Sequence, residues 1–192
     1  METYEFVGES IDHLVNLDVR PPHLEQGLLA KLYKAAREKM KRPLTLLAAE
    51  KLKEVLTPEN TAIISTGFVF PPHFPAGEMD GPPGAVALGK IINKGIGSKV
   101  FFLGESAIMG VMRATCAGAG IKLYEYESSK KVSRCCTLKD FPLDVEEAKK
   151  EADQFCKSTS PPPSLPSRRQ AETAKAFIIQ SLGATCLLTQ IR

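Results

Sequence analysis

The sequence predicts an α/β fold: a three-layer, Rossmann-like, mainly parallel sheet with flanking helices, preceded by an N-terminal pair of helices. Apolar, β-branched runs have the length of strands, amphipathic runs between them have the length of helices, and glycines or prolines separate the two. Strands and helices that alternate along a chain imply a parallel sheet with right-handed crossovers. With 192 residues, 43% of them hydrophobic, the chain is long enough for one ordinary domain with a helical extension.

Two amphipathic helices are expected ahead of the sheet. The first covers residues 24–40, where leucines recur at steps of three and four, and Pro43 closes it. The second covers residues 44–56 and carries an apolar stripe of its own, with Pro58 just beyond its end. These helices lead into the first strand, which we predict over residues 61–70 because that run is β-branched and apolar.

The middle of the chain is predicted to alternate between helices and strands. A helix starts near Pro82 and continues to about Lys94, because proline suits a first turn, where its missing amide proton has no intrahelical partner. A buried strand over residues 99–103 and a helix over residues 106–117 follow. A third strand is expected over residues 121–126.

After the third strand the pattern loosens into a polar loop over residues 127–134. A helix is expected over residues 144–157, with Asp144 and Glu147 forming its N-terminal cap. Residues 1–157 are therefore predicted to form one α/β domain.

The last part of the chain begins with residues 158–169, which are rich in proline and serine and are predicted to form a linker or a surface loop. Helical spacing resumes over residues 170–182, and an apolar strand is expected over residues 184–190. A parallel strand that no helix follows is incomplete. We therefore expect residues 170–192 to be the start of a C-terminal part of the same domain, in a fragment or a shortened isoform.

Charge and hydropathy exclude two classes of partner. The formal net charge is only +3 and basic residues do not interleave with aromatic ones, so nucleic acid is not expected as a ligand. No apolar run approaches the roughly 20 residues needed to cross a bilayer, so no membrane segment is expected.

Five irregularly spaced cysteines and the lack of an apolar signal segment indicate a reducing, intracellular compartment.

The loop over residues 77–85 (GEMDGPPGA) is the strongest candidate for a functional site. In open α/β sheets, ligands bind where strands end and helices begin, and this loop occupies such a junction. Glu78 and Asp80 can bind a substrate's ammonium group, act as general base or acid, or hold a divalent metal such as Mg²⁺ or Mn²⁺. The helix that begins near Pro82 offers unpaired amides and a positive dipole end to an anionic group.

A purely structural interpretation of the same residues is equally supported by the motif. Glu78 and Asp80 precede a first helical turn, where acids are favoured regardless of catalysis. The glycines do not follow the Gly-x-Gly-x-x-Gly spacing, and no Walker motif is present. A nucleotide-binding or sugar-phosphate module of generic Rossmann-like type is therefore only a third, weaker hypothesis.

Several of these residues together resemble a known family. Thr66-Gly67-Phe68, Pro71-Pro72 and the run from Glu78 to Ala85 are similar to the signature of the D-glutamate cyclase domain, and the resemblance extends over residues 18–126. It implies a lyase that closes D-glutamate to 5-oxo-D-proline and water. In such an enzyme we expect Glu78 and Asp80 to be catalytic. The residues expected to bind the substrate are Thr66, Gly67, Gly81 and Gly84.

The resemblance also implies a location and a possible metal. Vertebrate members are mitochondrial, so the mitochondrial matrix is implied, whereas the acidic N-terminus of this chain does not resemble a transit peptide and leaves the cytoplasm as the alternative. The only cofactor considered is a divalent metal, Mg²⁺ or Mn²⁺.

The chain departs from the family pattern at Met79, where the family usually has threonine between the two acids. The family's further motifs after the third strand also have no clear counterpart beyond Ser158. The rival hypothesis is therefore a non-catalytic, truncated isoform that binds a small acidic ligand or a partner protein.

Overall fold

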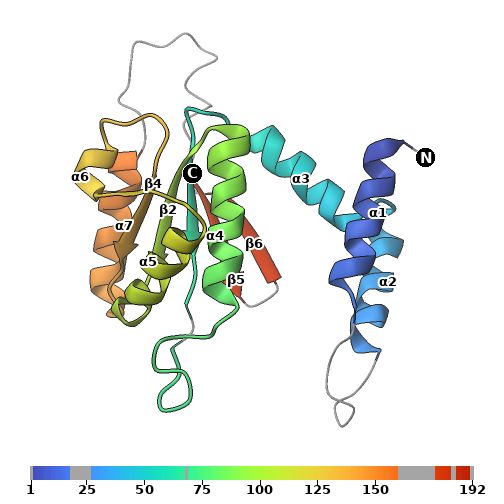
Figure 1. Ribbon diagram of the computed structural model, residues 1–192, viewed down its shortest axis with the longest axis horizontal. Coiled ribbons are helices and arrows are strands. Elements are labelled where there is room, and N and C mark those ends of the chain that lie inside the picture. Colours follow the sequence, from blue (N-terminus) through green and yellow to red (C-terminus); the bar gives the residue numbers. More distant parts are fainter. Residues whose placement is uncertain (1, 18–26, 68, 160–175, 183–184, 191–192) are drawn as a thin grey trace. The chain divides into compact units, whose positions relative to one another are not determined.

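The computed structural model describes residues 2–17, 27–67, 69–159, 176–182 and 185–190 (Figure 1). The chain divides into two compact units, a helical unit, Met1–Val55, and a sheet unit, Leu56–Arg192.

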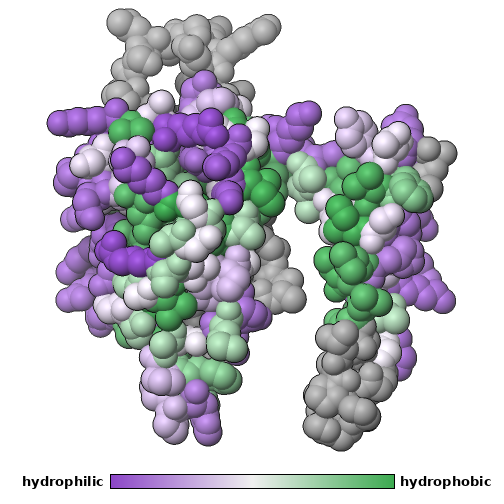
Figure 2. All heavy atoms as spheres, viewed as in Figure 1, coloured by the Kyte–Doolittle hydropathy of each residue, from purple (hydrophilic) through white to green (hydrophobic). Residues whose placement is uncertain are grey.

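The helical unit contains α1 (Thr3–Val15), α2 (Leu28–Met40) and α3 (Leu44–Val55). The predicted pair corresponds to α2 and α3, whereas α1 was not predicted. Gly8 of α1 lies so close to α3 that an added Cβ would be 2.9 Å from side-chain atoms of Pro43 and Leu46. The apolar residues of α1 and α2 are largely exposed, and Figure 2 shows apolar side chains gathered along one side of this unit.

A buried carboxylate joins α1 to the start of α3. Asp12 is only 1% exposed, and its oxygens accept hydrogen bonds from the amides of Leu44, at 2.6 Å, and Thr45, at 2.9 Å. The hydroxyl groups of Thr45 and Tyr33 donate to it as well, at 2.6 and 2.9 Å. Asp12 therefore satisfies the first amides of α3, which have no partners within the helix.

The sheet unit is built on six strands in the order β3-β4-β2-β1-β5-β6. They are β1 (Thr61–Ser65), β2 (Lys99–Gly104), β3 (Leu123–Tyr124), β4 (Cys136–Asp140), β5 (Ala176–Leu182) and β6 (Thr185–Gln190). Every neighbouring pair is parallel except β5 and β6, which pair antiparallel. The prediction of a mainly parallel sheet is confirmed.

Helices cover both faces of this sheet, as the predicted three-layer architecture requires (Figure 1). The helices of the sheet unit are α4 (Gly81–Ile91), the π turn η1 (Ile92–Ile96), the 3-10 turn η2 (Ser106–Ile108), α5 (Met109–Gly118), α6 (Tyr126–Ser129) and α7 (Val145–Thr159). A Cβ on Gly89 of α4 would collide with the ring of Phe102, so α4 lies on the face toward which Phe102 points. The opposite face carries Ile63 and Phe101, which form a buried cluster with Phe155 of α7. The Phe101 and Phe155 rings meet edge to face at 5.0 Å.

Helix boundaries in the middle of the chain agree with their local signals. Pro82 lies in the first turn of α4, as predicted. Gly97 ends the following π turn with a left-handed φ of 91°, a conformation that glycine adopts without steric cost. Asp144 caps α7, because its carboxylate accepts hydrogen bonds from the amides of Glu146 and Glu147.

The strand assignments need five corrections. The first strand ends at Ser65 rather than at residue 70, and the third strand is only Leu123–Tyr124. Strand β4 was not predicted, since its sequence CTLKD is half polar and too short to stand out. The helix predicted over residues 170–182 is wrong for Ala176–Leu182, which forms β5 along β1, while residues 170–175 lie outside the described part. The final strand is confirmed as β6, but it is antiparallel to β5.

Candidate functional site

The candidate site lies where β1 ends and α4 begins. Thr66 directly follows β1, and its amide donates to the carbonyl of Leu103 at 3.1 Å, continuing the pairing with β2 for one more residue. The chain then runs through the acidic loop, residues 67–80, and returns to start α4 at Gly81 (Figure 1). The loop is thus at the carboxyl edge of a parallel sheet, as predicted.

Thr66 carries the most informative atom of the site. The residue is only 4% exposed, and its Oγ1 is buried without a hydrogen-bond partner among the described residues. A Cβ placed on Gly81 would be 2.7 Å from this oxygen, so the hydroxyl points at the first residue of α4. A buried hydroxyl without a partner costs roughly 1–3 kcal/mol, and such groups are rare in folded proteins.

The start of α4 offers fewer free amides than an ordinary helix. Pro82 and Pro83 have no amide proton, and the Gly84 amide donates to the carbonyl of Asp80 at 3.2 Å. Within the described part of the chain, this leaves Gly81 as the first-turn residue whose amide is available to an anion. The Gly84 amide is therefore already engaged within the helix.

Within the described ranges, the two acids of the loop have no other polar partner in view. Asp80 occupies the N-cap position of α4, but its side chain makes no capping hydrogen bond. Glu78 is half-buried and Asp80 is exposed, and neither has an ion-pair partner among the residues that the structure describes. The structure thus weakens the interpretation that Asp80 serves as a helix cap and leaves both carboxylates accessible to a ligand. Met79 between them is 87% exposed.

Gly67 and Gly104 fit closely against one apolar side chain. Gly67 has a φ of 126°, and a Cβ there would be 2.8 Å from Cδ1 of Ile108. A Cβ on Gly104, the last residue of β2, would be 2.8 Å from the Thr66 carbonyl and would also collide with Ile108. Ile108 is completely buried, and its side chain packs against both glycines. Gly104 and Ile108 were not predicted as part of the site. The only signal in the sequence was a glycine at the end of a strand, Gly104.

His73 of the acidic loop stacks on Phe70, with ring centroids 5.8 Å apart. In the described ranges, no three His, Cys, Asp or Glu side chains are grouped as metal ligands would be. None of the helices in those ranges combines the length and the apolar character needed to cross a bilayer.

A family model described as D-glutamate cyclase-like, C-terminal, matches residues 23–173. The match covers well over half of the chain and includes the acidic loop, Thr66 and the start of α4. No curated protein and no solved structure matches the chain.

Proposed function

This chain belongs to the D-glutamate cyclase-like family, and on that premise we propose that it is a lyase that converts D-glutamate to 5-oxo-D-proline and water. The observation that carries the proposal is the family match, which spans the acidic loop and the strand end beside it. The buried Thr66 hydroxyl, which is directed at Gly81 and has no partner among the described residues, supports it, because such a hydroxyl is able to donate to a carboxylate.

The reaction forms a bond between the α-nitrogen and the γ-carboxyl carbon and breaks one C–O bond of that carboxyl group. The ammonium group loses two protons, and both end on the oxygen that leaves as water. Protons are therefore moved and not consumed. One carboxylate that accepts a proton from nitrogen and returns it to oxygen can serve both steps. Glu78 and Asp80, which are not committed to other described groups, are the candidates for this transfer.

Positioning supplies much of the acceleration for a ring closure. A substrate folded so that nitrogen and carboxyl carbon lie about 3 Å apart has already lost the freedom that the transition state would remove. Donation to the γ-carboxylate from Thr66 and Gly81 would hold one end of the substrate and stabilise the charge on its oxygens as nitrogen attacks.

The test is the reaction itself. The full chain is incubated with D-glutamate or L-glutamate, with and without Mg²⁺ or Mn²⁺, and 5-oxoproline is followed by chiral chromatography. We expect product from the D-isomer and a loss of turnover in Asp80→Asn or Glu78→Gln without a loss of folding. Glu59→Gln is the matched control, because Glu59 is also exposed but precedes β1, at the opposite edge of the sheet.

Two outcomes would count against the proposal. A folded sample that binds D-glutamate but yields no product would favour the non-catalytic alternative. That alternative is supported by the exposed Met79, which stands between the two acids where the family usually has a hydroxyl-bearing residue. Full activity in both Asp80→Asn and Glu78→Gln would remove the acidic loop from the mechanism.

A further inference from the structure

Asp140, the last residue of β4, lies in the same row of the sheet as Thr66. Ser65 pairs with Leu103, so the next residue, Thr66, is level with Gly104. Gly104 in turn pairs with Asp140, which places Thr66, Gly104 and Asp140 side by side across three strands. Residues level with one another in a parallel sheet point to the same face. Thr66 points at α4, and Asp140 therefore lies on the α4 face as well.

The chain topology makes the junction between β2 and β4 a natural crevice. After β2 the chain enters α5, which lies beside α4, as shown by the Lys90 ammonium that donates to the Ala119 carbonyl at 2.8 Å. After β4 the chain enters α7, whose Phe155 packs on the opposite face. Neighbouring parallel strands whose helices go to opposite faces leave a crevice at their carboxyl ends, where ligands bind.

The Asp140 carboxylate is oriented by a hydrogen bond, and no described residue neutralises its charge. The Ser106 hydroxyl, just after β2, donates to its Oδ2 at 2.6 Å. The Phe141 amide donates to the Gly104 carbonyl at 2.9 Å, which fixes the backbone next to it. Among the described residues no cation pairs with Asp140, and the carboxylate is exposed.

We propose that Asp140, positioned by Ser106, binds the ammonium group of the substrate whose γ-carboxylate is held by Thr66 and Gly81. This inference rests on the proposed function. The unpartnered Thr66 hydroxyl, buried and directed at the start of α4, marks the carboxylate end independently of the acidic residues. Asp140 supplies the opposite charge at the other end of the same row.

The dimensions agree with a glutamate folded for ring closure. Two strand spacings separate the backbones of Thr66 and Asp140 by about 10 Å. A carboxyl carbon and an amine about 3 Å apart, with a hydrogen bond of about 2.8 Å at each end, span about 9 Å. Ile108, which is fully buried, covers Gly104 between them, so the substrate has to lie above this side chain.

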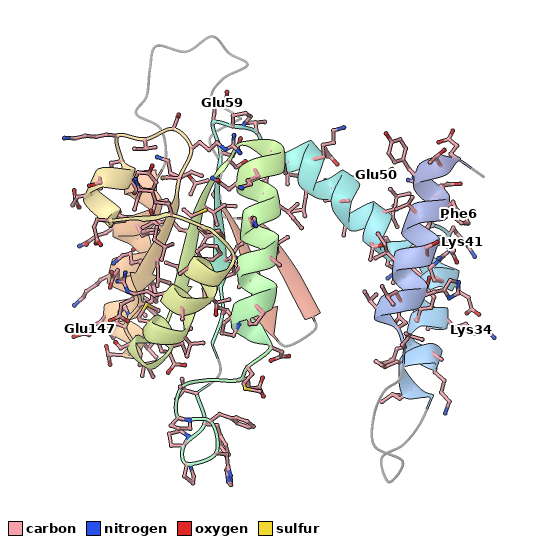
Figure 3. The ribbon with its side chains drawn as sticks, in the orientation of Figure 1. Phe6, Lys34, Lys41, Glu50, Glu59 and Glu147 are labelled. Atoms are coloured by element: carbon pink, nitrogen blue, oxygen red, sulfur yellow. The ribbon has the colours of Figure 1, made fainter. Side chains whose placement is uncertain are left out.

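The test separates the two ends of the substrate. Glutarate has the two carboxylates of glutamate but no amine, so it probes the carboxylate end alone. The KM and kcat for D-glutamate and the inhibition constant of glutarate are measured on the full chain for wild type, Asp140→Asn and Ser106→Ala. Glu59→Gln is the control: Glu59 is also exposed and accepts a hydroxyl hydrogen bond at 2.6 Å, from Thr57, but lies at the amino edge of the sheet (Figure 3).

Asp140→Asn is expected to raise KM about tenfold or more, the usual effect of losing one charged hydrogen bond, with a smaller change in kcat. The inhibition constant of glutarate stays within about twofold of wild type if the lost contact is to the amine alone. Ser106→Ala gives a smaller rise in KM, and Glu59→Gln leaves all three constants unchanged.

A wild-type KM in Asp140→Asn, or an equal weakening of D-glutamate and glutarate, overturns the assignment of Asp140 while the proposed function stands. A wild-type chain that forms no 5-oxoproline overturns both, so the two failures are distinguishable.

Discussion

The carboxylate of Asp12 accepts two hydrogen bonds from Thr45, one from its amide at 2.9 Å and one from its hydroxyl at 2.6 Å. The two residues are 33 positions apart, on α1 and α3. A helix is usually capped by a residue that directly precedes it, but Pro43 holds that place here and has no side-chain oxygen. The cap therefore comes from another helix and ties α1 to α3.

Replacing Asp12 with asparagine should destabilise the helical unit strongly. Asparagine has one acceptor oxygen in place of two, so at least one buried donor from Leu44, Thr45 or Tyr33 is left without a partner. We expect a loss of roughly 2–4 kcal/mol in the free energy of unfolding, measured by urea denaturation with circular dichroism. Asp144→Ala, which removes the exposed cap of α7, is the comparison and should cost about 1 kcal/mol. Equal losses in the two variants would contradict the structural role assigned to Asp12.

The same carboxylate predicts a pH dependence. Burial by itself would raise the pKa of Asp12, but the hydrogen bonds from Thr45, Leu44 and Tyr33 outweigh it and hold the pKa below the ordinary value of 3.8. A carboxyl group with a lowered folded-state pKa stabilises the protein above its unfolded pKa and loses that contribution as the pH falls through the folded value. The stability difference between wild type and Asp12→Asn should be constant from pH 7 to about 5 and shrink below 3.8. A difference that grows in acid would contradict this sign.

The sequence predicts those parts of the fold that depend on a residue's own backbone and misses those that depend on pairing between distant segments. Pro82 was correctly predicted in the first turn of α4, because proline acts through its own backbone, and Gly97 ends the same helical segment through its own backbone as well. Strand β5 was assigned to a helix because AFIIQSL has no strand alternation, and its extended form depends on pairing with β1. The row from Thr66 to Asp140 is set by register across three strands, which no motif along the chain records.

Gly81 and Gly84 are separated by one turn of α4 but should respond differently to alanine. A Cβ on Gly81 would be 2.7 Å from the Thr66 hydroxyl, whereas a Cβ on Gly84 meets no atom within 4 Å. Gly81→Ala should therefore cost roughly 1–3 kcal/mol in unfolding free energy, while Gly84→Ala should gain about 0.5–1 kcal/mol from its helical backbone. Thermal denaturation of both variants measures this. Adding Thr66→Ala to Gly81→Ala should recover part of the loss, and strict additivity of the two changes would contradict the contact.

Thr66→Val separates a structural from a binding role for the buried hydroxyl. Valine keeps the shape of threonine and removes an oxygen that has no described partner, so the melting temperature should be equal to or above that of wild type. If the hydroxyl donates to the substrate, kcat/KM for D-glutamate should fall about tenfold in the same variant. A stable variant with wild-type kcat/KM would show that the hydroxyl has no part in binding.

The buried thiols of the sheet unit should be inert in the native protein. Burial raises the pKa of Cys116 to about 11 and that of Cys136 to about 12, and it raises the pKa of Cys135 as well. The thiolate is the reactive form, so at pH 8 very little of it is present, and the side chains are also shielded from reagent. Iodoacetamide should leave all three unmodified in the native chain and modify them in urea, as read by peptide mass spectrometry. Rapid labelling of Cys116 or Cys136 without denaturant would show that the α5 side of the sheet opens, because Cys116 is a buried residue of α5 and Cys136 a buried residue of β4.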